Sequence, residues 1–339
     1  MKKFTLLILT FLLLSFTACG SDTEKSDEKP NEKSGEYTSE NITLNAGTEF
    51  ELRGILTIPN SVTGKIPAVV LVHGSGSHNM DESVYSYAPF KDIADYLSAN
   101  GIAVLRYDKS TYIHGAKMAE NLSELTVKEE TINDAVAAAE LLRNDERIDS
   151  DKIYLLGHSL GGMLAPRIDA EGGNFAGIII WAGSPRSFME IWFDQAEAEY
   201  LNSPENQKEL LRQQIDAVKE LFEIAKDLSD EEAKQISLLG ASLYYYMEMN
   251  LYPAEDYLRD MTKPILIMQG GKDFQVYANK DYTEYQRILE GKDNAVFKLY
   301  PELNHFFITS TTGTIDEYKV RDNVSEEVLK DITDWIKAN

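Results

Sequence analysis

Short, continuous runs of apolar residues recur along the chain and constrain its fold more than any other feature. The clearest run, 68–72, reads Ala-Val-Val-Leu-Val and lacks the alternation of a strand with one face in water. This composition is typical of a strand buried on both faces, as in a parallel sheet. Similar runs occur at 102–105, 153–156, 178–181, 265–268 and 295–299. The sequence therefore predicts a sheet whose central strands are covered on both sides.

Helical patterns lie between most of these runs. The segment 90–99 has apolar residues at three- and four-residue spacing and ends at Asn100-Gly101, and 131–143 has the same periodicity. A hairpin is expected before them, from 41–44 and 50–58. Strands that alternate with helices predict an α/β fold with a doubly wound, mostly parallel sheet, in which ligand chemistry lies at the carboxyl ends of the strands.

One segment, 184–260, interrupts the alternation, because it has no strand-like run. A helix is expected after Ser203-Pro204, and Ser229 with Glu232 forms a capping-box pattern that begins another. We therefore expect a helical lid inserted between two neighbouring strands. Six aromatic residues of this segment either line a pocket under the lid or pack the lid onto the body: Phe188, Trp192, Phe193, Tyr244, Tyr245 and Tyr246.

The amino terminus has the pattern of a secretory signal. Two lysines precede an apolar run from Phe4 to Phe16, which is shorter than the roughly 17–25 residues of a membrane span. The next residues, Thr17-Ala18-Cys19, complete a match that resembles a bacterial lipobox and implies a lipid on Cys19. An ordinary cleaved signal is the alternative. Because Cys19 is the only cysteine, neither a disulfide within the folded part nor thiol catalysis is expected.

Residues 20–36 contain no apolar side chain, a composition that favours a disordered tether. We therefore divide the chain into a signal (1–19), a tether (20–40) and a folded domain (41–339) that contains the lid (184–260). The formal net charge of −23 excludes nucleic acid as a favourable partner and disfavours anionic lipid surfaces. We thus expect an extracytoplasmic protein held at the cell membrane only through Cys19, and we leave its oligomeric state open.

The main candidate for chemistry is Ser159, the centre of the motif Gly157-His158-Ser159-Leu160-Gly161. A predicted strand precedes the motif and a helical pattern follows it. This context favours a strained strand-to-helix turn that exposes the serine hydroxyl, with glycines where a Cβ would collide. An ordinary glycine-rich loop is the alternative.

A serine hydroxyl needs a base to activate it and a carboxylate to orient that base. Where the serine occupies a strand-to-helix turn of this kind, the acid and then the histidine follow it in the chain. Four of the five histidines precede Ser159, which leaves His305, just after the run 295–299, as the base. Asp273 follows the run 265–268 and is the preferred acid. Four other acidic residues between Ser159 and His305 are also candidates but are interpreted as solvated carboxylates: Glu255, Asp256, Asp281 and Asp293.

An oxyanion formed at the serine must meet backbone N–H groups that are already in place. We expect one from Leu160, directly after the serine. The second should come from the loop that follows 68–72, with Ser75 as the first choice and Gly76 as the second. His73 is interpreted as a brace for that loop.

These motifs together resemble the α/β-hydrolase superfamily. The resemblance rests on HGSG at 73–76, GHSLGG at 157–162, GGKD at 270–273 and NH at 304–305, and it covers nearly all of 41–339. The segments 89–94 and 101–109 are similar to bacterial serine esterases related to dienelactone hydrolases and prolyl-oligopeptidase-like domains. The segment 77–81 departs from that group, which leaves the shape of the acyl pocket open.

The resemblance implies hydrolysis of small-molecule esters. Short or medium acyl chains are expected because the insertion lacks the long apolar run of a lid that binds a lipid interface. The resemblance assigns the nucleophile, the base, the acid and the oxyanion donors to Ser159, His305, Asp273, Leu160 and Ser75. No metal or cofactor is expected, because the chain has neither a His-Glu-x-x-His pair nor a nucleotide-binding glycine motif after its first strand. A peptidase or acyltransferase with the same triad, and a non-catalytic tethered binding protein, are the alternatives.

Overall fold

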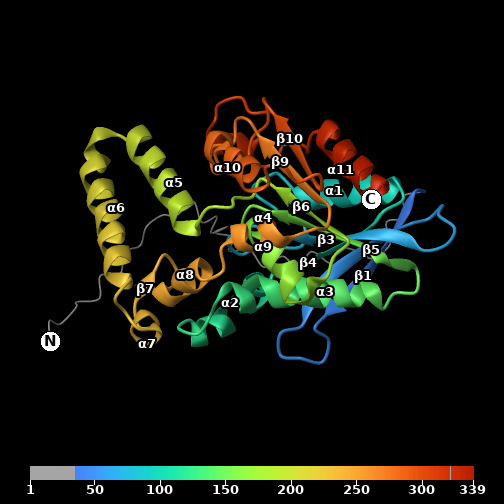
Figure 1. The fold of residues 1–339 in the computed structure, drawn as a ribbon, viewed down its shortest axis with the longest axis horizontal. Helices are drawn as coiled ribbons and strands as arrows, with labels where there is room; N and C mark the ends of the chain where they lie inside the picture. The colour runs from blue at the N-terminus through green and yellow to red at the C-terminus, as the bar shows by residue number, and fades with distance from the viewer. Residues whose placement is uncertain (1–34, 321) are drawn as a thin grey trace.

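An eight-stranded sheet forms the centre of the protein (Figure 1). The computed structural model describes residues 35–320 and 322–339. In spatial order the strands are β1 (Tyr37–Leu44), β2 (Leu52–Pro59), β4 (Ala103–Tyr107), β3 (Ile66–Val72), β5 (Ile148–His158), β6 (Gly177–Trp181), β9 (Ile265–Gly270) and β10 (Ala295–Tyr300). The strands from β4 to β10 are parallel, whereas β1 and β2 form an antiparallel hairpin at one edge. The predicted hairpin and mostly parallel sheet are confirmed.

Apolar side chains of the central strands point alternately to the two faces of the sheet. In β3, Val70 and Val72 belong to the core cluster on one face, and Val69 and Leu71 belong to the cluster on the other. All four are fully buried. This explains why the strand has a continuous apolar run, since a strand covered on both sides has no position for a solvated side chain.

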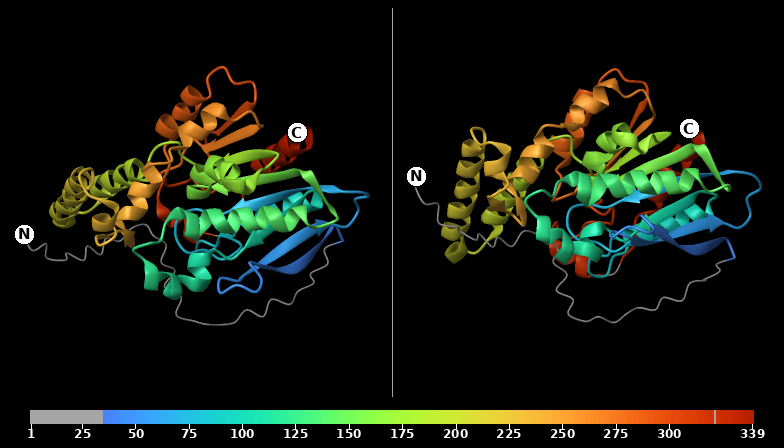
Figure 2. Two further views of the ribbon diagram at one scale, coloured as in Figure 1. Left: turned by 60° about the horizontal axis from the view of Figure 1, so that its bottom comes forward. Right: turned by 90° about the horizontal axis from the view of Figure 1, so that it is seen from below.

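Helices cover both faces (Figures 1 and 2). On one face lie α1 (Pro89–Ala99) and α11 (Glu326–Ala338), which contact each other. On the other lie α3 (Asn133–Arg143), α4 (Leu160–Ile168) and α10 (Thr283–Ile288). The remaining helical elements of the body are α2 (Ser110–Met118), η1 (Ala119–Asn121), η2 (Lys128–Ile132), η3 (Asp169–Gly173), η4 (Ala278–Tyr282) and η5 (Ile315–Lys319).

The chain between the adjacent strands β6 and β9 leaves the body, and the long helices α5 and α6 project from it as a pair (Figure 1). It forms α5 (Phe188–Asn202), α6 (Glu205–Ala225), α7 (Asp230–Ala233), β7 (Ser237–Leu238), β8 (Ala241–Ser242), α8 (Leu243–Asn250) and α9 (Ala254–Asp260). The predicted capping box is confirmed, because Ser229 and Glu232 cap α7 reciprocally.

The prediction that this insertion contains no strand is wrong. β7 and β8 pair as a hairpin around Leu239 and Gly240, whose φ angles of 49° and 86° are typical of a type I′ turn. Two-residue strands are too short to produce a recognisable apolar pattern. The sequence analysis therefore could not predict them.

The prediction that the tether extends to residue 40 is also wrong. Residues 37–40 were expected to be disordered, but they belong to β1 and pair with β2, starting at Tyr37 opposite Pro59. An edge strand is stabilised by backbone hydrogen bonds and tolerates polar side chains, so the composition of this segment was misleading. The predicted signal, Cys19 and the tether up to residue 34 lie outside the described residues.

Candidate active site

Ser159 occupies the sharp turn between β5 and α4. Its φ and ψ are 52° and −112°, a conformation that non-glycine residues rarely adopt. The two glycines of the motif make this turn possible. A Cβ on Gly157 would lie 2.2 Å from the carbonyl oxygen of Gly161, and a Cβ on Gly161 would lie 2.4 Å from that of Val72. The strained turn predicted from the motif is therefore confirmed.

Asp273 and His305 lie beyond the ends of β9 and β10 and form a buried pair. Nδ1–H of His305 donates to Oδ2 of Asp273 at 2.7 Å, and both residues are at most 5% exposed. Gln269 also donates to Oδ2, while the backbone N–H groups of Gln275 and Val276 donate to Oδ1. These donors satisfy both carboxylate oxygens and fix the orientation of the side chain. They also fix the histidine tautomer in which Nε2 is free to accept a proton.

His158 connects the His305 loop to the turn that carries Ser159. Its Nε2 donates to the backbone carbonyl of His305 at 3.3 Å, and the centroids of the two imidazole rings are 4.6 Å apart. Because His158 directly precedes Ser159, this contact places the His305 loop against the turn that carries Ser159. The structure thus brings together the turn at Ser159 and the loop of His305, the two regions that the sequence analysis predicted to form the site.

The backbone around Ser75 is held by side chains that contact its carbonyl groups. Lys109 Nζ donates to the Gly74 carbonyl at 2.8 Å, and His78 Nε2 donates to the Ser75 carbonyl at 2.8 Å. In a trans peptide the N–H points away from the preceding carbonyl, so these bonds fix the directions of the Ser75 and Gly76 N–H groups. Both residues line the same pocket as Ser159 and Leu160.

Leu160 supplies a second amide at this position. It is the first residue of α4, and the first-turn N–H groups of a helix have no acceptor within the helix. An anion at the Ser159 side chain would therefore meet free amides and the positive end of the helix dipole. The arrangement is suitable for stabilising an oxyanion.

His73 braces the loop as expected. Its Nε2–H donates to the Asn79 carbonyl at 3.0 Å. Burial lowers the pKa of His73 to about 3, so the imidazole is neutral at pH 7. A neutral ring that is fully enclosed and bonded to a backbone carbonyl has a structural role.

Glu82 was missed by the sequence analysis. Its carboxylate is buried beneath the site, where Oε1 accepts the Gly74 N–H at 2.6 Å and lies 3.0 Å from His158 Nδ1. Burial would raise the pKa of Glu82, but the adjacent His158 outweighs it and the pKa is about 2. Glu82 also has a positive φ of 50°. It follows a polar loop, 77–81, and no local pattern distinguishes it from a solvated carboxylate.

Among the alternative acids, the interpretation of Asp281 as solvated is wrong. Asp281 is fully buried, accepts two hydrogen bonds from Arg186 at 2.8 and 3.0 Å, and accepts a third from Ser184. Burial is possible because the guanidinium compensates the charge. Of the other three carboxylates, Asp256 and Asp293 are exposed, and Glu255 is partly buried in ion pairs with Arg259 and Arg287.

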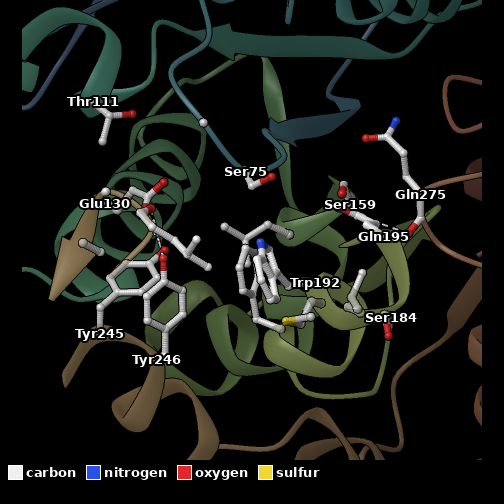
Figure 3. A pocket seen from close by; sticks show the side chains of 18 of the residues that line it. Ser75, Thr111, Glu130, Ser159, Ser184, Trp192, Gln195, Tyr245, Tyr246 and Gln275 are labelled. Carbon is white, nitrogen blue, oxygen red and sulfur yellow. Dashed lines mark hydrogen bonds between the residues drawn. The ribbon is translucent and has the colours of Figure 1, made fainter. Parts of the chain in front are cut away.

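Ser159 opens into a cavity of about 240 Å³ between the body and the insertion (Figure 3). The picture shows Ser159, Gln275, Gln195 and Ser184 on one side, Trp192 and Ser75 in the middle, and Thr111, Glu130, Tyr245 and Tyr246 on the opposite side. Of the six aromatic residues considered from the sequence, four line the cavity: Phe188, Trp192, Tyr245 and Tyr246. Phe193 instead packs against Trp192, and Lys234 lies over the ring of Tyr244.

Within residues 35–320 and 322–339, no group of three or more His, Cys, Asp or Glu residues is arranged to hold a metal ion. In the same part of the chain, no helix combines the length and the apolar character needed to cross a bilayer.

Comparison with known proteins agrees with this geometry. Residues 69–314 match the alpha/beta hydrolase family. Esterase EstD of Thermotoga maritima is 34% identical over 302 residues, which cover 88% of this chain and 68% of EstD. The esterase Pf2001 of Pyrococcus furiosus superposes with a TM-score of 0.55 at 15% identity, over 89% of this chain and 91% of that protein. Est1E of Butyrivibrio proteoclasticus superposes with a TM-score of 0.53 at 16% identity, over 88% and 96%. With its strained turn at Ser159, its buried Asp273–His305 pair and these relatives, the chain belongs to the alpha/beta hydrolase family.

Proposed function

We propose that the protein hydrolyses carboxylic esters through an acyl-enzyme, with Ser159 as nucleophile, His305 as base and Asp273 as the acid that orients it. The observation that carries the proposal is the strained Ser159 at a cavity, next to a loop whose histidine is bonded at 2.7 Å to a buried carboxylate. The 34% identity to a protein named an esterase supports the same reaction.

In the first half of the reaction, Nε2 of His305 takes the proton of the Ser159 hydroxyl while the serine oxygen attacks the ester carbonyl. The Leu160 and Ser75 N–H groups, with Gly76 as the alternative second donor, receive the oxyanion. One such donor contributes about 2.7–4 kcal/mol to transition-state stabilisation. The imidazolium, stabilised by Asp273, then protonates the departing alcohol.

In the second half, water replaces the alcohol. His305 takes a proton from water, the resulting hydroxide attacks the acyl carbon, and the same amides hold the second oxyanion. Ser159 leaves with the proton from His305, which releases the carboxylic acid and restores the enzyme.

The size of the cavity supports esters with short or medium acyl chains. Its volume of about 240 Å³ lies below the roughly 300–1,000 Å³ typical of sites for drug-sized ligands. Helices α5 and α8 contribute Phe188, Trp192, Tyr245 and Tyr246 to its wall. We therefore assign the insertion 184–260 the role of a lid that covers the bound acyl group.

Steady-state kinetics test the assignment. The wild-type protein should hydrolyse p-nitrophenyl butyrate, and Ser159→Ala should lower kcat by roughly a millionfold, as expected for a triad that acts as a unit. Ser61→Ala, at an exposed position away from the cavity, is the matched control and should retain wild-type rates. Turnover of an aminoacyl p-nitroanilide in preference to the ester would indicate a peptidase. No turnover of either would favour a binding protein.

We also propose that the chain is exported and held at the outer face of a bacterial membrane by a lipid on Cys19. The signal pattern in 1–18 and the lipobox-like residues before Cys19 support this location. Cells supplied with an alkyne-tagged fatty acid should label the wild-type protein, and Cys19→Ala should abolish the label. Equal labelling of both proteins would contradict the proposal.

A further inference from the structure

The side of the cavity across from Ser159 is polar, although it lies under the lid. Figure 3 shows Glu130 and Tyr245 together there, with Thr111 on the same side. Glu130 belongs to η2 and is 8% exposed, Thr111 belongs to α2, and Tyr245 belongs to α8 of the insertion. These three residues, which we call the polar end, are separated from Ser159 by the aromatic ring of Trp192.

The polar end is electrically balanced. The buried Lys109 places Nζ 2.6 Å from Oε1 of Glu130, so the carboxylate and the ammonium compensate each other. Tyr245 donates its hydroxyl hydrogen to Oε2 of Glu130 at 2.5 Å. Burial, followed by the neighbouring carboxylate, raises the pKa of Tyr245, so its hydroxyl stays protonated. The polar end therefore offers no unpaired charge that could bind an anion or a cation.

Hydrogen-bonding capacity nevertheless remains at the polar end. Oγ1 of Thr111 is buried and has no hydrogen-bond partner among the described residues. The phenolic oxygen of Tyr245 donates but can also accept, and each oxygen of Glu130 can accept a second bond. A buried hydroxyl without a partner costs free energy that a partner would recover. A ligand that both donates and accepts would satisfy these atoms.

We propose that the polar end binds a neutral hydroxyl group on one arm of the ester, so that the preferred substrates are hydroxylated esters in place of plain alkyl esters. This inference rests on the proposed esterase function and specifies its substrate class. A hydroxyl suits this end chemically, because it can accept a hydrogen bond, as the Thr111 hydroxyl hydrogen requires, and can donate one to an oxygen of Glu130 or Tyr245. An alkyl end would leave Oγ1 of Thr111 buried without a partner. A buried polar group that loses its partner in this way is the reason why hydrogen-bonding sites reject analogues that lack the matching group.

Matched ester pairs test the proposal on each arm of the substrate. For the acyl arm, methyl hexanoate is compared with methyl 6-hydroxyhexanoate. For the alcohol arm, hexyl acetate is compared with 6-hydroxyhexyl acetate, and four- and eight-carbon homologues of both pairs vary the reach. Proton release in a pH-stat gives kcat/KM, and division by the alkaline hydrolysis rate of the same ester removes differences in intrinsic reactivity.

For at least one pair, the hydroxylated ester should have a kcat/KM about three- to tenfold higher, as expected for one or two neutral hydrogen bonds. Thr111→Val and Tyr245→Phe remove single hydroxyl groups, and each should lower this ratio to one or below. Thr43→Val, on the exposed side of β1, is the matched control and should keep the wild-type ratio.

Two results would overturn the inference while leaving the esterase function intact. The first is hydrolysis of the plain esters with a ratio at or below one in every pair. The second is a ratio that stays high in both Thr111→Val and Tyr245→Phe, with circular dichroism showing that the variants are folded. If the wild-type protein hydrolyses none of these esters, nor p-nitrophenyl butyrate, the proposed function fails and the inference fails with it.

Discussion

At the scale of single residues, the site depends on two non-glycine residues with positive φ, Ser159 and Glu82. The sequence motif around Ser159 predicts the strained backbone, because glycines occupy the positions where a Cβ would collide. Glu82 has no such signal. It contacts both the Gly74 N–H and the imidazole of His158, and thus links the loop 73–76 to the turn that carries Ser159.

Replacing Glu82 tests whether this link positions the reacting groups. Glu82→Gln keeps the size of the side chain and an oxygen for the Gly74 N–H but removes the charge beside His158. We expect kcat on p-nitrophenyl butyrate to fall about ten- to hundredfold, with a smaller change in KM, because misplacement of the catalytic groups affects the transition state most. The exposed Glu120→Gln serves as control. A Glu82→Gln enzyme with wild-type kcat would show that the contact is only structural.

The sequence predicted Asp273 and His305 correctly as a pair because each follows a strand that the apolar runs had located, and parallel strands end at the same edge of a sheet. It did not predict the partners of Asp281 and Glu82. Those contacts join segments that are distant in the chain, and no local pattern encodes them. Buried charges are therefore the part of the site that required the structure.

At the scale of secondary structure, the strands with the strongest apolar runs were the most predictable, since burial on both faces requires them. The hairpin β7–β8 was not predictable, because two residues carry no periodicity. The π-helical turn η2, which carries Glu130, was also not distinguished from the helix α3 that follows it. The predicted helical segment 131–143 combines the last two residues of η2 with α3.

A buried ion pair attaches the insertion to α4, the helix that begins directly after Ser159. Arg167 of α4 donates to Glu248 of α8 at 2.6 and 3.2 Å, and their side chains are 4% and 10% exposed. Glu248→Ala leaves Arg167 with Glu171 as its remaining carboxylate partner, and we expect the free energy of unfolding to fall by about 3 kcal/mol. Urea denaturation measures the change. The exposed Glu231→Ala should change stability by less than about 0.5 kcal/mol, and equal effects of the two substitutions would contradict this view.

At the scale of the whole molecule, the buried histidines under the site make stability depend on pH. The pKa of His73 is about 3 in the folded protein and 6.5 in its ordinary state, so the unfolded chain takes up a proton first as the pH falls. The stabilisation from a neutral His73 is therefore complete above about pH 6.5 and is lost as the pH falls toward 3. Each pH unit in that window costs roughly 1.4 kcal/mol for a group of this kind.

His73→Gln isolates this contribution, because the amide can still donate to the Asn79 carbonyl but does not titrate. Unfolding free energies from urea titrations at pH 5.0, 5.5 and 6.0 should fall less steeply with decreasing pH in the variant, by roughly 1 kcal/mol per pH unit. Parallel pH profiles of the two proteins would show that His73 is not the group responsible.

The central claim is that Ser159 is the reactive nucleophile, and covalent labelling tests it most directly. The wild-type protein is treated with a fluorophosphonate, digested and analysed by mass spectrometry to locate the adduct. We predict a single adduct on the peptide that contains Ser159, and no labelling of Ser159→Ala. An adduct on another serine, or undiminished labelling of the variant, would contradict the account.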